Sequence, residues 1–392
     1  MAKAKRVTKK ELKAAVHQHL EQLGFRKKGK GYILEGELTK DRIRTLYEGA
    51  RHRRLYDEGQ LLKKHGHLLV ASLADGRTVN PARVDPELVQ VFPESPEAVL
   101  FRLATLFWSV PVSRGFGRRL RFLVRDRQNS SLIGIFALGD PVFNLTARDS
   151  WIGWDAQARK ERLVHVMDAY VVGSLPPYSQ LLGGKLVAAL VASDDVRAAY
   201  AKQYLERKSI ISGIRKSADL VLVTTTSALG RSSMYNRLRV PEGPQFTQLG
   251  FTKGYGHFHL DGDVFAMMRL YLQQLGHPYA SGNRFGMGPS WRLRVVRAAL
   301  EELGLDSDSV LKHGIRREVY ALPVAANWRE VLQGTASEAE PLTWSSREIA
   351  EKCIDRWIAP RSKRCPEFAR FRVSAVCDAL GIPSLQSDLF EH

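Results

Sequence analysis

One order of elements constrains the fold of this chain more than any other feature: an apolar strand, two amphipathic helices and a second apolar strand. The strands are expected at residues 171–175 and 220–226, and the helices at 180–191 and 195–207. A strand–helix–strand unit of this length joins parallel neighbours in one sheet. The sequence therefore predicts an α/β arrangement with parallel pairing in the middle of the chain.

Just before this unit the sequence predicts an antiparallel hairpin. Residues 120–124 and 132–138 are short runs rich in Leu, Ile, Val and Phe, and the polar residues 126–130 lie between them. Together the hairpin and the parallel unit predict an α+β fold, with a mixed β-sheet core flanked by helices.

The two ends of the chain are expected to be helical. Thr8 can cap a helix over residues 11–23, whose apolar positions have helical spacing, and a basic turn and a second helical stretch follow. This order suits a helix-turn-helix-like DNA-binding unit, although many small helical modules share it. Four prolines between residues 80 and 96 place a boundary there. We therefore expect three domains: residues 1–95, 96–260 and 261–392.

The chain carries a large excess of positive charge. Its 59 Lys and Arg residues face 41 Asp and Glu residues, which gives a formal net charge of +18 and a sequence pI near 9.9. Such a balance favours a nucleic-acid partner, for which we expect DNA, because Lys and Arg neutralise phosphates and release counterions. A solvated basic surface with no partner is the alternative.

Nothing in the sequence points to a membrane or to secretion. No run of about 18 apolar residues is present, and no apolar signal segment follows the charged first residues. The three cysteines form no CxxC pair, and their odd number argues against a disulfide framework. We therefore expect a cytoplasmic protein with reduced thiols and no membrane partner.

Basic residues gather around the expected hairpin, with Phe116 and Phe122 among them. A strand can present alternating arginines to a phosphate backbone, so we expect nucleic-acid contacts here. The alternative is an edge strand protected by its charges. The residues expected to bind nucleic acid are Arg118, Arg119 and Arg121, and the same cluster includes Arg114, Arg125 and Arg127.

Several blocks of the central region resemble the DruA family of the Druantia anti-phage systems. The most specific reads RDSWIGW, residues 148–154, and is similar to the family's RD-aromatic-IGW block. Residues 230–236 and 248–256 resemble its G-x-x-Tyr block and its LG-x-T-x-G turn, and residues 318–323 give a weaker match. The resemblance covers about residues 115–330. It implies a role in defence against phage, or in a related mobile element, acting on DNA with partner proteins.

The same region resembles the acyltransferase fold called GNAT. In that fold a central strand leads into a helix whose N-terminus holds the pyrophosphate of coenzyme A, and a tyrosine protonates the departing thiolate. Glycines let backbone N–H groups approach phosphate at such a helix N-terminus. The resemblance implies that Tyr235 is a catalytic acid, with a packing role as the alternative. It also implies that Gln180, Gly183, Gly184 and Lys185 bind an acyl-coenzyme A, with an ordinary strand-to-helix turn as the alternative.

The RD…IGW block admits two interpretations. Arg148 and Asp149 form either a hydrogen-bonded structural pin or part of a catalytic site in which Arg148 contacts a phosphate. Trp151 and Trp154 likewise either pack inside the protein or stack on nucleic-acid bases. The sequence alone leaves both pairs of alternatives open.

No metal site is indicated, because no set of Cys, His or carboxylate residues has a convincing spacing. Asp140, Asp149, Asp155 and Asp168 could hold Mg²⁺ for phosphodiester cleavage, but no motif fixes their geometry. Three functions remain, in descending order of support. They are a DNA-binding defence component on a GNAT-like scaffold, an acyl-coenzyme A-dependent transferase that modifies nucleic acid or protein, and a metal-dependent nuclease or transposase-like protein. The sequence does not decide whether the chain is an enzyme.

Overall fold

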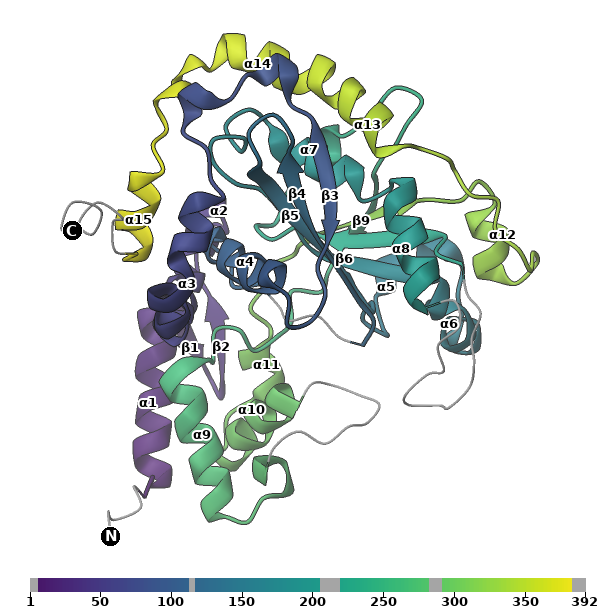
Figure 1. Cartoon of the computed structure of the whole chain (residues 1–392). Coiled ribbons are helices and arrows are strands. Elements are labelled where there is room, and N and C mark those ends of the chain that lie inside the picture. Colours follow the sequence, from purple (N-terminus) through teal and green to yellow (C-terminus); the bar gives the residue numbers. More distant parts are fainter. Residues whose placement is uncertain (1–5, 113–116, 205–218, 282–290, 383–392) are drawn as a thin grey trace, which may run out of the picture. The chain divides into compact units, whose positions relative to one another are not determined.

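The computed structural model describes residues 6–112, 117–204, 219–281 and 291–382, which belong to two compact units (Figure 1). Each unit combines segments that are far apart in the sequence, so the units differ from the three consecutive domains that we expected. Unit 1 comprises residues 1–56, 109–111 and 252–317, and unit 2 comprises residues 57–108, 112–251 and 318–392.

Within the described residues no helix is both long and apolar enough to cross a bilayer.

Unit 2 is built on a seven-stranded mixed sheet. Neighbouring strands are antiparallel except β6 and β7, whose parallel pairing is the one predicted from the strand–helix–strand order. The predicted hairpin is present as β4 and β5. From edge to edge the strands are β3 (Pro86–Gln90), β4 (Arg119–Asp126), β5 (Ser131–Gly139), β6 (Val166–Ser174), β7 (Leu222–Thr226), β9 (Glu318–Pro323) and β8 (Thr247–Phe251).

Helices flank this sheet, and the α+β fold predicted from the sequence is therefore confirmed (Figure 1). The central one is α7 (Gly183–Leu190), which packs on β5 and β6 and buries residues 186–190 in the main core. The other helices that precede the C-terminal region are α3 (Gly59–Ala71), α4 (Pro96–Ala104), α5 (Thr146–Ile152), α6 (Ala156–Arg162), α8 (Asp194–Tyr204) and α12 (Trp328–Gln333).

The C-terminal helices of unit 2 form a strap, residues 345–382, which packs against α7 (Figure 1). Ser345 and Glu348 make a capping box at its start, each side chain accepting the backbone N–H of the other residue. A π turn precedes Pro360, whose missing N–H cannot complete a regular helical turn. The strap contains α13 (Ser346–Cys353), the π turn Ile354–Ile358, α14 (Ala359–Arg364) and α15 (Ser374–Leu380).

Unit 1 is a helical bundle with a β-hairpin. Thr8 caps its first helix through a capping box with Glu11, and Leu12, Val16 and Leu20 are buried in its core, as their spacing predicted. That helix packs on α9, which also packs on α10. The elements of unit 1 are α1 (Lys9–Gln22), β1 (Phe25–Lys28), β2 (Gly31–Leu34), α2 (Lys40–Asp57), α9 (Gly262–Gln274), α10 (Trp291–Glu302) and α11 (Ser307–Leu311).

The hairpin of unit 1 lies where the sequence predicted only a basic turn. Its two-residue tip, 29–30, uses Gly29 at a φ of 61°, a conformation that glycine adopts readily. α11 covers the outer edge of β2: the Tyr32 N–H donates to the Ser309 hydroxyl at 3.2 Å, and that hydroxyl donates to the Tyr32 carbonyl. Because a hairpin joins α1 and α2, these helices do not have the tight connection of a helix-turn-helix.

Candidate functional site

The parallel pair at the centre of the sheet of unit 2 opens into a fork. β6 and β7 pair over three residues each, ending at Asp168 opposite Thr224, and β6 then continues to Ser174 beside β5. Thr225 bridges the opening, since its hydroxyl donates to the Ala169 carbonyl at 2.8 Å. Side chains at the fork are therefore held by two diverging strands.

Asp168 and Tyr235 bring titratable groups to this fork. The Thr224 hydroxyl donates to Asp168 Oδ1 at 2.8 Å, and burial raises the pKa of Asp168 to about 6. Burial also raises the pKa of Tyr235 to about 12, although a hydrogen bond with Thr225 opposes that shift. The Tyr235 ring packs against that of Tyr320, with centroids 5.2 Å apart. Near neutral pH the fork thus offers a carboxylate that can accept a proton and a phenol that can donate one.

A buried carboxylate at the start of β9 joins the three family-like blocks that follow the RD…IGW block. Glu318 is 2% exposed and accepts hydrogen bonds from the Ser232 N–H at 2.7 Å and from the amides of Asn236 and Gln248 at 3.3 Å. The Tyr320 hydroxyl also donates to it. This cluster fixes the segment between β7 and β8. Sequence reasoning missed it, because the donors from the other two blocks lie 70 to 86 residues before Glu318.

The loop from β6 into α7 does not form the backbone cradle expected for coenzyme A. The N–H groups of Gln180, Gly183 and Lys185 donate to carbonyls of the loop itself, at 2.9 to 3.0 Å. Close packing accounts for Gly183, since a Cβ there would lie 2.7 Å from the Tyr178 carbonyl oxygen. The donors that a phosphate would need are occupied at these positions, so the geometry favours the ordinary-turn alternative for the backbone.

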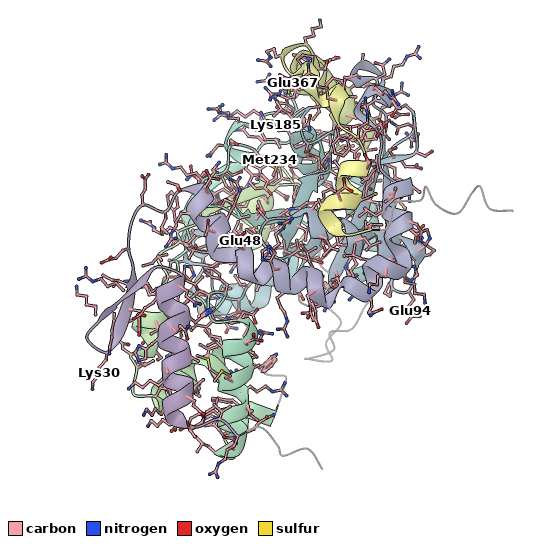
Figure 2. The ribbon with its side chains drawn as sticks, turned by 90° about the vertical axis from the view of Figure 1, so that its left-hand side faces the viewer. Lys30, Glu48, Glu94, Lys185, Met234 and Glu367 are labelled. Carbon is pink, nitrogen blue, oxygen red and sulfur yellow. The ribbon has the colours of Figure 1, made fainter. Side chains whose placement is uncertain are left out.

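Gly184 and Lys185, at the start of α7, lie next to side chains of other segments. A Cβ on Gly184 would lie 3.1 Å from the sulfur of Met234, which Figure 2 shows close to Lys185. The Lys185 ammonium lies 4.5 Å from the centroid of the Trp357 ring, on the strap. Because the Lys185 backbone N–H is already bonded to the Leu182 carbonyl, a ligand at this position would have to contact the side chain.

Arg148 and Asp149 form a buried pin beneath the loop between β5 and α5. Arg148 is 0% exposed, and its two terminal nitrogens donate to the Val142 and Phe143 carbonyls, both at 2.9 Å. Its Nε donates to Asp149 at 2.8 Å, and Asp149 also accepts from Arg159 at 3.0 Å. Because Arg148 is buried and every one of its donors is already bonded to a group of the protein itself, the geometry favours the structural pin over a phosphate contact.

The two tryptophans of the same block pack against α12. Trp154 is 8% exposed, and its Nε1–H donates to the Leu332 carbonyl at 2.6 Å. Trp151 stacks on Trp328 with centroids 4.3 Å apart, and the Arg329 guanidinium lies 4.4 Å from the Trp328 ring. A nucleic-acid base could stack on Trp154 only if that side chain left the core, whereas Trp151 is half-buried and has one face already covered.

The arginines expected to bind nucleic acid differ in their surroundings. Arg118 is bound internally, since its Nε donates to Asp140 at 2.6 Å and its Nη2 to the Val166 carbonyl at 3.1 Å. Arg121 is half-buried, and Arg119 is exposed. Of the three, Arg119 presents its charge most fully to solvent. Two residues of the same cluster, Arg114 and Phe116, lie outside the described residues.

The aspartates considered for a metal site have separate structural roles. Asp140 and Asp149 pair with arginines, Asp155 caps α6, and Asp168 accepts from the Thr224 hydroxyl. Within the part of the chain that the structure describes, no three Asp, Glu, His or Cys side chains gather as metal ligands would. Among these residues, the nuclease alternative therefore has no assembled metal site.

Positive charge is concentrated in unit 1. Its 125 residues include 25 Lys and Arg and 12 Asp and Glu, a net charge of +13, whereas the other 267 residues include 34 and 29, a net charge of +5. Lys27, Lys28 and Lys30 are exposed at the hairpin, and Figure 2 shows Lys30 at its tip. His17 on α1 packs against Tyr32 of the hairpin, with ring centroids 5.6 Å apart, and burial, followed by the charges of Lys27 and Lys13, lowers the pKa of His17. The lysines of α1 and of the hairpin therefore lie close together. We name Lys13, Lys27, Lys28 and Lys30 the hairpin patch.

Comparison with known proteins covers most of the chain. The sequence model of the family described as Druantia protein DruA matches residues 37–334. The chain is 44% identical over 377 residues to the Druantia protein DruA of Escherichia coli (strain UMEA 4076-1), an alignment that covers 96% of this chain and 93% of that protein. No solved structure matches. The range matched by the family contains every block on which the resemblance was based.

Proposed function

Because this chain belongs to the DruA family of Druantia proteins, we propose that it is a nucleic-acid-binding component of anti-phage defence. The hairpin patch of unit 1 contacts the phosphates, and duplex DNA is the nucleic acid we expect. One observation carries the proposal: unit 1 holds +13 of the net charge of +18 in about a third of the chain. Clustered Lys and Arg residues bind phosphates through counterion release, which gives strongly salt-dependent affinity.

The RD…IGW block has a structural role in this proposal, and most of its residues do not contact nucleic acid. We assign Arg148, Asp149 and Trp154 to holding α5 and its loop in place, because their hydrogen-bond partners are internal. Arg119 is exposed and remains a candidate for a phosphate contact. Trp151 remains a candidate for a contact with nucleic acid at the edge of the ring that it stacks on Trp328.

A charge-matched pair of variants tests the proposal. The first, K27Q/K28Q/K30Q, removes three charges from the hairpin patch. The second, R77Q/R83Q/K202Q, removes three exposed charges from unit 2. Fluorescence anisotropy with a labelled duplex of about 20 base pairs gives the slope of log K against log salt, which should fall by about 2 to 3 in the first variant and stay unchanged in the second. Equal slopes in the two variants would remove the hairpin patch from the interface.

The sheet of unit 2 favours group transfer as a second candidate. Its hairpin, its central strand, the helix after that strand and the parallel neighbour are elements of the GNAT-like fold expected from the sequence. At the fork Asp168 would accept a proton from an attacking group, and Tyr235 would donate one to the leaving group. Coenzyme A does not fit the loop before α7 as a backbone-bound ligand, because the N–H groups of Gln180, Gly183 and Lys185 are already bonded.

Calorimetry with acetyl-coenzyme A tests this second candidate without assuming an acceptor. Micromolar binding that Gly184→Trp abolishes would support transfer from an acyl donor. No detectable heat with the folded wild-type protein would exclude acetyl-coenzyme A as the donor for the fork. The nucleic-acid proposal would be unaffected.

A further inference from the structure

Three basic residues from distant parts of unit 2 come together beside the start of α7. The Lys185 ammonium lies 4.5 Å from the centroid of the Trp357 ring, and the Arg356 guanidinium carbon lies 5.7 Å from the same centroid. Lys185 also donates to the Arg237 carbonyl at 3.4 Å. Trp357 is 7% exposed and belongs to the π turn of the strap. The helix, the strap and the segment after β7 therefore each supply one basic residue, and the one after β7 contacts Lys185 through its backbone carbonyl.

These cations repel one another. Burial lowers the pKa of Lys185, and the charges of Arg237 and Arg356 lower it further. Among the ion pairs of the described residues, none joins these three side chains to a carboxylate. The neighbouring Cys353 thiol supplies no negative charge near neutral pH, because burial raises its pKa to about 12. The protein thus concentrates positive charge here without balancing it.

We propose that Lys185, Arg237 and Arg356 bind a compact polyphosphate anion, such as the diphosphate group of a nucleotide. Two of the three cations lie on the face or edge of one buried indole, which limits the freedom they would lose on binding. The positive end of the α7 dipole adds to the attraction. Unlike the backbone cradle expected from the sequence, this site uses side chains, and one of them belongs to the strap.

The proposal depends on neither function proposed above, since pyrophosphate binding to the full chain can be measured without an activity assay and without DNA. Calorimetry with inorganic pyrophosphate at low ionic strength is the direct test. Wild-type protein should bind, and Arg237→Ala or Arg356→Ala should each weaken binding about tenfold, as the loss of a charge-assisted contact does. The matched control is Arg347→Ala on the same strap. Arg347 pairs with Glu351 at 2.9 Å, so this substitution also removes one positive charge but leaves the three proposed ligands in place.

Duplex DNA then separates the two sources of phosphate. Unchanged DNA affinity in Arg356→Ala, together with weakened pyrophosphate binding, would assign the site to a small nucleotide-like anion. A parallel loss of DNA affinity would assign it to the nucleic-acid backbone. Equal pyrophosphate affinity in Arg356→Ala and Arg347→Ala, or no binding by the folded wild-type protein, would overturn the proposal.

Discussion

Replacing Arg148 by methionine separates a structural pin from a functional site. The substitution removes a fully buried guanidinium that donates to Asp149 at 2.8 Å and to the Val142 and Phe143 carbonyls at 2.9 Å. Breaking a buried ion pair from one side costs about 3–5 kcal/mol. Two features place this case near the lower limit: Val142 and Phe143 are 53% and 41% exposed, so water can reach the loop, and Asp149 keeps Arg159 as a partner.

A loss of about 3 kcal/mol lowers the melting temperature of a unit of this size by about 6–12 °C. Differential scanning calorimetry measures the shift, and DNA anisotropy below the transition measures function. Adding Asp149→Leu to Arg148→Met should cost less than the sum of the single changes, because neither member of the Arg148–Asp149 pair is then left buried without the other. The structural role of Arg148 is refuted if Arg148→Met melts within about 1 °C of wild type and yet loses DNA binding, because that result is expected of a residue that contacts DNA directly.

Burial lowers the pKa of His259 to about 4 and that of His313 to about 3. The unfolded chain therefore binds more protons below pH 6.5, and each histidine should cost unit 1 about 2 kcal/mol of stability between pH 7 and pH 5, visible as a falling melting temperature that His259→Phe makes shallower. Gly183→Ala should destabilise unit 2, because its Cβ meets a backbone carbonyl at 2.7 Å, whereas Gly49→Ala, in an open position on α2, should stabilise unit 1 by about 0.5–1 kcal/mol in urea unfolding. Trp154→Phe leaves a buried carbonyl without its donor and should cost about 1–3 kcal/mol in the same assay, and an unchanged midpoint would contradict the role of its indole N–H.

Elements with local causes could be predicted from the sequence. The capping boxes begin with Thr8 and Ser345, each followed three residues later by glutamate, and both are present. The hairpin of β4 and β5 and the parallel pair of β6 and β7 followed from apolar runs and the length of the connection between them. In each case the signal lies within a short stretch of sequence or in the order of consecutive elements.

Two strands of the seven-stranded sheet were missed because they lie at its edges. β3 begins at Pro86, and an edge strand tolerates a proline that a central strand would not. β8 has a register irregularity between Gln248 and Gly250, which breaks the alternation that marks a strand, and Gly250 has a φ of 142°. Neither segment carries the apolar pattern of a buried strand.

The candidate sites depended on contacts between distant residues. Tyr235 was singled out from the sequence, but Asp168 was considered only as a metal ligand, because β6 begins five residues before the predicted strand. Glu318 has no local signal, since all its donors except Tyr320 come from the segments before and within β8. The concentration of positive charge in unit 1 could not be predicted from the sequence, because residues 1–56 and 252–317 are far apart in the chain and belong to one unit only in the fold.

The contact between unit 1 and DNA can be located most directly by hydrogen–deuterium exchange of the full chain with and without a duplex. Amides of the hairpin, residues 25–34, and of α1 should exchange more slowly with DNA, and high salt should abolish the difference. Protection confined to unit 2, with exchange in unit 1 unchanged while the protein is saturated with DNA, would contradict the account.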